Sequence, residues 1–121
     1  DSAEWEPLFL HSSIAKTMDA LERKIAFIGH THYPGIHCKM RARTIALTSS
    51  IVAIGPHQYL VNPGSVGQPR DGNWRASYAI WYVEKNAVEL YRVEYPVGRT
   101  QEKMQVLDFP QFTIDRLSQG A

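Results

Sequence analysis

The chain has 121 residues, of which 44% are hydrophobic and 21% are charged. This size is typical of one domain with its own hydrophobic core, so the composition excludes a disordered segment and a coiled coil. Lysine and arginine number 13 against 12 acidic residues, and no long run of like charge occurs. Electrostatics therefore gives no indication of a nucleic-acid or membrane-surface protein.

The single cysteine, Cys38, excludes an internal disulfide. No stretch approaches the roughly 20 apolar residues that span a bilayer. These two features favour a reduced, cytoplasmic setting. The chain begins at Asp1 without an initiator methionine, and we interpret this beginning as a cut or processed end.

An amphipathic helix is predicted to begin after Ser12 or Ser13, because either side chain suits a helix N-cap. Apolar residues recur on one side of this helix at positions Ile14, Met18 and Leu21. The run from Ile25 to Ile28 follows. It is apolar on both faces, which predicts a central strand covered by a layer on each side.

The segment Gly29-His30-Thr31-His32 comes directly after that strand. In an extended backbone, side chains at positions i and i+2 point to the same side, so His30 and His32 are expected to converge on one point. Neutral imidazole binds zinc, manganese, iron, nickel and copper, and Gly29 lets the backbone approach a bound ion. Two histidines do not complete a metal centre, because a catalytic zinc takes at least three protein ligands. The alternative is a histidine pair that only hydrogen-bonds a surface turn.

The middle of the chain is predicted to be rich in β-structure. Alternating side chains indicate a strand over 36–41, and strand-like runs at 44–47 and 51–54 suggest a meander. Gly55-Pro56 marks a turn before a further strand-like run at 59–61. Residues 76–83 and 87–93 are expected to pair as a hairpin across a tight turn at Lys85-Asn86. After Pro96 the pattern returns to helix, with Thr100 as a cap, and Pro110 opens a second helix that Gly120 ends.

The segment from Asn62 to Gly72 holds three glycines and two prolines in eleven residues, which predicts a long loop of largely fixed shape. Such loops often carry function. Its glycines leave amide groups accessible, and the guanidinium of Arg70 suits a bidentate contact with phosphate or carboxylate. The alternative is a rigid connection in which Arg70 only pairs with Asp71 or another acid.

Two further candidate ligands follow the histidine pair. His37 and Cys38 are neighbours in a predicted strand and therefore point to opposite faces, which disfavours a four-ligand zinc site. Cys38 alternates with Ile36 and Met40, so we interpret it as a core residue rather than a nucleophile. His57 is interpreted as a turn residue.

The order of these motifs closely resembles the calcineurin-like metallophosphoesterases. The resemblance rests on Gly29 to Pro34 after a strand, the loop from Asn62 to Gly72, and Arg75 to Ala79. It covers essentially the whole chain and best matches a small bacterial branch of predicted phosphodiesterases related to diadenosine tetraphosphatase. It implies an α/β fold of the α+β sandwich kind: the C-terminal part of a four-layer α-β-β-α sandwich, β-rich with flanking helices.

The resemblance also implies a chemistry, the hydrolysis of phosphate mono- or diesters by a metal-activated hydroxide. Two divalent ions (manganese, iron, nickel or zinc) would lie about 3.5 to 4 Å apart. His30 would bind the metal shared with an asparagine and a third histidine. His32 would bind the metal shared with an Asp-x-His pair. We expect Asn62, Gly64 and Arg70 to shape the site or contact the substrate phosphate.

The motifs that come earlier in this family are absent: Asp-x-His, Gly-Asp-x-x-Asp, Gly-Asn-His followed by an acid, and a lone histidine ligand. We therefore expect residues 1–121 to be the C-terminal part of a single domain whose N-terminal half is missing. The chain alone would be inactive and hold no catalytic residue. Its partners would be that half and a phosphate-ester substrate, with nucleic acid only as a nucleotide substrate and a homo-oligomer left open. The alternative is a non-catalytic protein-interaction module on the same fold.

Overall fold

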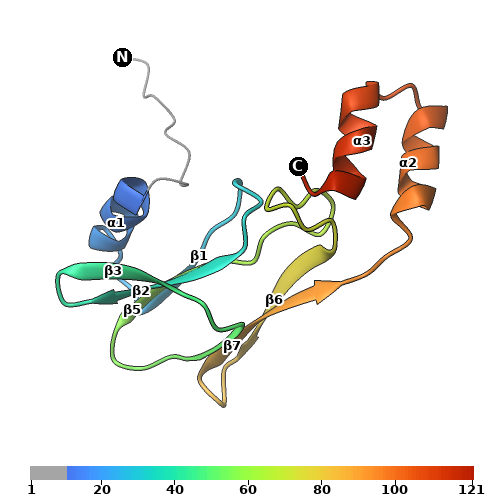
Figure 1. The fold of residues 1–121 in the computed structure, drawn as a ribbon. Coiled ribbons are helices and arrows are strands. Elements are labelled where there is room, and N and C mark those ends of the chain that lie inside the picture. Colours follow the sequence, from blue (N-terminus) through green and yellow to red (C-terminus); the bar gives the residue numbers. More distant parts are fainter. Residues whose placement is uncertain (1–10) are drawn as a thin grey trace.

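The computed structural model describes residues 11–121, which form two β-sheets and three helices (Figure 1). The elements, in chain order, are α1 (His11–Asp19), β1 (Ile25–Phe27), β2 (Gly35–Met40), β3 (Arg43–Leu47), β4 (Ile51–Ala53), β5 (Gln58–Asn62), β6 (Ala76–Tyr82), β7 (Ala87–Val93), α2 (Val97–Val106) and α3 (Gln111–Gln119). This mixed α+β architecture agrees with the predicted class.

The first sheet has the strand order β1-β5-β2-β3, and the second has the order β4-β7-β6. β1 pairs in parallel with β5, and the other pairs are antiparallel. The predicted meander is therefore wrong, because β4 joins the second sheet, and β5 lies in the middle of the first. The physical reason lies in β5, where Leu60 and Val61 are completely buried and need neighbours on both sides.

The main core fills the space between the two sheets. Its buried side chains come from both: Ile36, Cys38, Ile54, Tyr59, Val61 and Val88. A second cluster lies on the opposite face of the first sheet, where Ile14 and Met18 of α1 pack on Leu60. The predicted apolar face of this helix is thus confirmed. Burial of each of these aliphatic side chains contributes about 1.5 to 3 kcal/mol before entropic costs.

β1 differs from its prediction as a central strand. Within the described residues it pairs only with β5, so it forms one edge of the first sheet. Phe27 is 45% exposed, and its ring lies 5.6 Å from that of Trp81, which is 42% exposed. β1 thus has the apolar composition of a buried strand, but within the described residues it has no partner on one edge and its Phe27 side chain is exposed.

The β6–β7 hairpin is confirmed, with Tyr82 paired to Ala87 next to the turn. The turn is longer than expected, because residues 83–86 all lie outside the strands. Asn86 has a φ of 48° and donates its N–H to the Val83 carbonyl.

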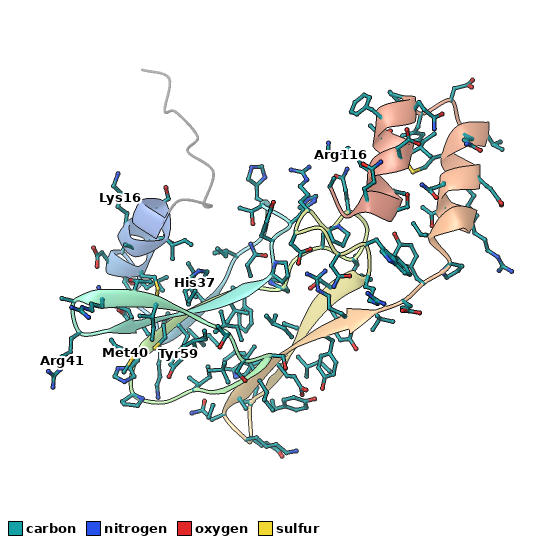
Figure 2. All side chains as sticks on the ribbon, in the orientation of Figure 1. Lys16, His37, Met40, Arg41, Tyr59 and Arg116 are labelled. Atoms are coloured by element: carbon teal, nitrogen blue, oxygen red, sulfur yellow. The ribbon has the colours of Figure 1, made fainter. Side chains whose placement is uncertain are left out.

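At the end of β2, Met40 is 44% exposed and Arg41 projects away from the sheet (Figure 2). The alternation that buries Cys38 therefore stops there.

The two C-terminal helices pack against each other. α2 begins at Val97, so Thr100 lies inside the helix and the predicted cap is wrong. Pro96 lies at the N-cap of this helix, where no side chain of the described residues makes a capping hydrogen bond. Gly120 ends α3 in the left-handed conformation, with a φ of 68°, as predicted. None of the helices described over 11–121 has the length and apolar character that a membrane span requires.

Candidate metal centre

The His30–His32 loop begins where β1 leaves the first sheet. Ile28 still donates its N–H to the Val61 carbonyl at 2.9 Å, and the chain then turns sharply, with the Thr31 N–H on the Gly29 carbonyl at 2.9 Å. His30 and His32 have φ values of 73° and 62°. The expectation of an extended backbone is therefore wrong, and strand alternation is not what brings the two histidines onto one short loop.

Thr31, between the two histidines, is buried at 4% exposure. Its Oγ1 accepts a hydrogen bond of 2.7 Å from Asn62 Nδ2 and one of 3.3 Å from the Tyr33 N–H. Asn62 Oδ1 in turn accepts the Gly64 N–H at 3.0 Å. Asn62 is the last residue of β5, so this chain of bonds joins the histidine loop to the centre of the first sheet.

His32 is held by the loop between β5 and β6. Its Nδ1 lies 2.7 Å from the Gln68 carbonyl oxygen, and its own carbonyl accepts the Arg70 N–H at 3.3 Å. A carbonyl only accepts hydrogen bonds, so this contact selects the neutral tautomer in which Nδ1 carries the proton and Nε2 has the lone pair. Metal-binding histidines commonly have this arrangement, with one ring nitrogen on a backbone carbonyl and the other on the metal.

The loop from β5 to β6, which its prolines and glycines predicted, is held against β6 by hydrogen bonds. Ser77 of β6 donates its N–H to the Ser65 carbonyl at 2.8 Å and its Oγ to the Pro63 carbonyl at 2.8 Å. Pro69 is fully buried. Since Asn62 belongs to β5, the irregular part of the segment begins at Pro63.

Arg70 does not pair with Asp71, because the carboxylate of Asp71 binds Arg92 instead. The guanidinium of Arg70 donates one bond of 3.2 Å to the Gln68 side-chain oxygen. Its Nε is buried and has no hydrogen-bond partner within residues 11–121. A buried guanidinium N–H without an acceptor is a donor that an anionic ligand can satisfy.

His37 and Cys38 lie on opposite faces of β2. Cys38 belongs to the core between the sheets, where burial raises the pKa of its thiol and a hydrogen bond to Tyr59 opposes that rise. This confirms Cys38 as a core residue. His57 lies half-buried in the turn before β5. Across the described part of the chain, no three side chains of His, Cys, Asp or Glu lie close enough together to hold a metal ion.

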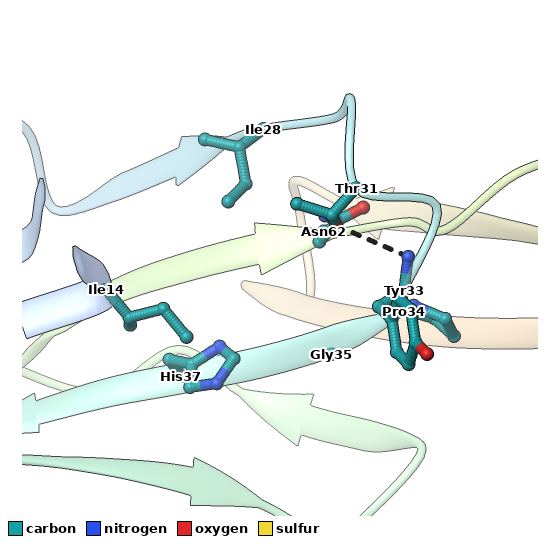
Figure 3. A pocket seen from close by; sticks show the side chains of 8 residues that line it. All are labelled: Ile14, Ile28, Thr31, Tyr33, Pro34, Gly35, His37 and Asn62. Atoms are coloured by element: carbon teal, nitrogen blue, oxygen red, sulfur yellow. Dashed lines mark hydrogen bonds between the residues drawn. The ribbon is translucent and has the colours of Figure 1, made fainter. Parts of the chain in front are cut away.

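A pocket of about 420 Å³ lies behind the histidine loop, on the α1 face of the first sheet (Figure 3). Thr31 and Asn62 lie side by side in its wall, Tyr33 and Pro34 close one end, and Ile14 and His37 lie toward the other. Neither His30 nor His32 lines this pocket. No pattern in the sequence indicates this pocket, because its lining comes from a helix, two strands and a loop.

The structure resembles part of a solved metallophosphoesterase. The match is to the crystal structure of a metallophosphoesterase from Sphaerobacter thermophilus, with a TM-score of 0.84 and 32% identity, over 97% of this chain and 50% of that chain. The described fold is therefore a fragment of a metallophosphoesterase fold, and the likeness supports the calcineurin-like superfamily.

Two other proteins match. The hypothetical protein PH1004 from Pyrococcus horikoshii shares the fold, with a TM-score of 0.66 and 21% identity over 95% of this chain and 40% of that chain. The uncharacterized protein MJ0912 of Methanocaldococcus jannaschii is 35% identical over 96 residues, which is 79% of this chain and 39% of that protein. No model of a known protein family matches the sequence. The chain thus spans half or less of the length of the proteins that it matches.

Proposed function

We propose that this chain supplies the His30 and His32 ligands of a dinuclear metal centre in an enzyme that hydrolyses phosphate mono- or diesters. The observation that carries the proposal is the likeness of 97% of the chain to part of a metallophosphoesterase. The histidine loop supports it independently. The Gln68 carbonyl occupies Nδ1 of His32 and leaves Nε2 as a donor for a metal ion.

The donors in this chain fit part of such a centre. Two imidazoles are ligands for manganese, iron, nickel or zinc, but residues 11–121 offer no group of three ligands. The remaining ligands, with a bridging carboxylate, must come from another segment. We propose that this segment is an N-terminal half of the same protein, that residues 1–121 are the C-terminal part of one domain, and that the chain alone is inactive.

A pair of divalent ions in this site would acidify a water molecule and neutralise charge on the phosphoryl oxygens. Arg70 is our proposed contact for the phosphate, because its guanidinium carries N–H groups beyond its single bond to the neutral Gln68 side chain. Asn62 and Gly64 would shape the site through the hydrogen bonds that link Gly64 to Asn62 and Asn62 to Thr31. We also propose that the protein belongs to the small bacterial phosphodiesterase branch and that it is located in the cytoplasm. The unpaired Cys38 supports the proposed location.

The test uses the protein that contains this chain together with its completing segment. Metal content is measured by mass spectrometry, and hydrolysis is followed with p-nitrophenyl phosphate and bis-p-nitrophenyl phosphate. We expect two divalent ions per protein and turnover of at least one ester. His32→Ala should remove one ion and lower turnover by more than the roughly hundredfold that loss of an outer-shell partner costs.

His57→Ala is the matched control, because His57 is half-buried at the opposite end of β5. It should keep both ions and full turnover. Full metal content and turnover in His32→Ala would overturn the metal assignment. A protein that binds no divalent ion even when complete would contradict the enzyme and favour the non-catalytic interaction module.

A further inference from the structure

The histidine loop has an unusual backbone. Five residues other than glycine have a positive φ within residues 11–121: His30, His32, Arg41, Asn86 and Asp108. The last three lie in hairpin turns or just after a helix, where this conformation is common. His30 and His32 instead flank a single residue in a loop that leaves a strand. Each left-handed residue costs about 1–2 kcal/mol, so the surrounding structure must hold this conformation in place.

Thr31 is the point at which the loop is held. Its buried hydroxyl accepts from Asn62 Nδ2 at 2.7 Å and from the Tyr33 N–H at 3.3 Å (Figure 3). Asn62 is itself 5% exposed and anchored by the Gly64 N–H. Each buried hydrogen bond contributes about 0.5–1.5 kcal/mol, and a buried group left without a partner costs about 1–3 kcal/mol. The free energy that these hydrogen bonds contribute is therefore similar in magnitude to the backbone strain that they oppose.

The second point of attachment is His32 itself. The Gln68 carbonyl fixes its Nδ1 and the Arg70 N–H fixes its carbonyl, so the ring and the backbone of one residue are held by the same loop. The buried Pro69 lies between those two contacts in the sequence, and its ring fixes the backbone angle φ there. Together, Thr31 and this loop determine both where His32 lies and which ring nitrogen is available.

We propose that Thr31 and Asn62 are positioning residues of the metal centre: their buried hydrogen bond keeps His30 and His32 left-handed and holds His32 on the Gln68 carbonyl, with Nε2 presented as the metal donor. This inference rests on the proposed function for the identity of the ligand, but its geometry concerns the metal-free protein. It gives Asn62 a role inside the site rather than on the substrate, because its Nδ2 already donates to Thr31 and its Oδ1 already accepts from Gly64.

The test is ¹⁵N NMR of the histidine rings in the metal-free complete protein, followed by calorimetric titration with Zn²⁺ alone. In the unsubstituted protein we expect His32 to be protonated on Nδ1. Thr31→Val keeps the shape of the side chain but removes the acceptor for Asn62 and Tyr33. It should mix the two His32 tautomers and weaken Zn²⁺ binding by about 10- to 100-fold, as loss of an outer-shell partner does.

Thr31→Ser keeps the hydroxyl and should restore both readouts. Thr17→Val is the matched control, since it removes a threonine hydroxyl bonded to Ser13 in α1, and it should change neither. Asn62→Leu removes the same hydrogen bond from the β5 side. If Thr31→Val does not fold, Asn62→Leu takes its place, with the same expected change in tautomer and in Zn²⁺ affinity.

Protonation of His32 on Nε2 in the unsubstituted protein would overturn the inference without any substitution. A folded Thr31→Val with unchanged tautomer and unchanged Zn²⁺ affinity would overturn it as well. Absence of Zn²⁺ binding in the unsubstituted protein would contradict the proposed function, and the metal-free tautomer measurements would then decide this inference separately.

Discussion

Gly64 brings the loop of the candidate site into contact with β6. Its φ is 82°, and a Cβ at this position would lie 2.7 Å from the Oγ and 2.8 Å from the Cβ of Ser77. Ser77 is 2% exposed and holds the Pro63 carbonyl, so it has no room to move. Glycine is therefore required at position 64 for steric reasons. A displaced backbone here would also disturb the hydrogen bond from the Gly64 N–H to Asn62 Oδ1.

We predict that Gly64→Ala destabilises the fold by about 2–4 kcal/mol, because left-handed strain and overpacking add. Urea unfolding followed by circular dichroism measures this change. Gly67→Ala is the control in the same loop, since a Cβ there meets nothing within 4 Å. It should change stability by less than about 0.5 kcal/mol. Equal effects of the two substitutions would show that the contact with Ser77 is unimportant.

Residue types in the candidate site could be predicted from sequence, but their conformations could not. The sequence placed His30 and His32 next to each other after a strand, which was enough to suggest a metal ligand pair. The hydrogen bond that we propose to hold their left-handed backbone joins Thr31 and Asn62, which are 31 positions apart. A hydrogen bond between side chains so far apart in the sequence cannot be predicted from neighbouring residues, because nothing in the sequence shows which asparagine a buried threonine will contact.

At the scale of elements, the strands were predicted better than their order. The β6–β7 hairpin has long alternating runs joined by a turn, so its pairing follows from neighbouring residues. β4 has only the residues Ile51–Ala53 and gives no local indication of which sheet it joins. β5 was placed in the middle of the first sheet by its burial, which depends on α1 and on the second sheet together.

The core between the sheets makes Cys38 a reporter of how they stay together. Burial raises the pKa of its thiol above the ordinary value of 9.0, and the opposing hydrogen bond to Tyr59 is the smaller effect. We predict that 5,5′-dithiobis(2-nitrobenzoate) modifies Cys38 far more slowly in the folded protein at pH 8 than after unfolding in urea. Equal rates in the two states would mean that the sheets separate freely.

The same pKa shift makes stability depend on alkaline pH. Because the folded pKa is raised, the contribution is fully present below pH 9.0 and is lost as the pH rises through the folded value. We predict that the free energy of unfolding falls above about pH 9 and that Cys38→Ala reduces the slope of that fall. Urea titrations at several pH values measure it, and an identical slope in the variant would contradict the assignment to Cys38.

At the scale of the whole molecule, one side of the first sheet is open. Within residues 11–121, β1 pairs only with β5, and the exposed ring of its Phe27 lies near the exposed ring of Trp81. An apolar strand with an unpaired edge is a site for further pairing. The histidine loop leaves the end of this same strand, so a segment that paired with β1 would lie next to His30 and His32. Completion of the sheet and completion of the proposed metal centre would then be one event.

We predict that this coupling is visible in amide hydrogen exchange. In the isolated chain, the amides of β1 that point away from β5 should exchange rapidly, because they lack a partner strand. The completing segment should protect them and also slow exchange across the His30–His32 loop, while the centre of the β6–β7 hairpin, whose pairing is already formed, serves as the internal control. Protection of β1 without any change in the histidine loop would separate sheet completion from the site. Strong protection of β1 in the isolated chain would show that its open edge is already satisfied, and that the ligands missing from the centre have to approach from elsewhere.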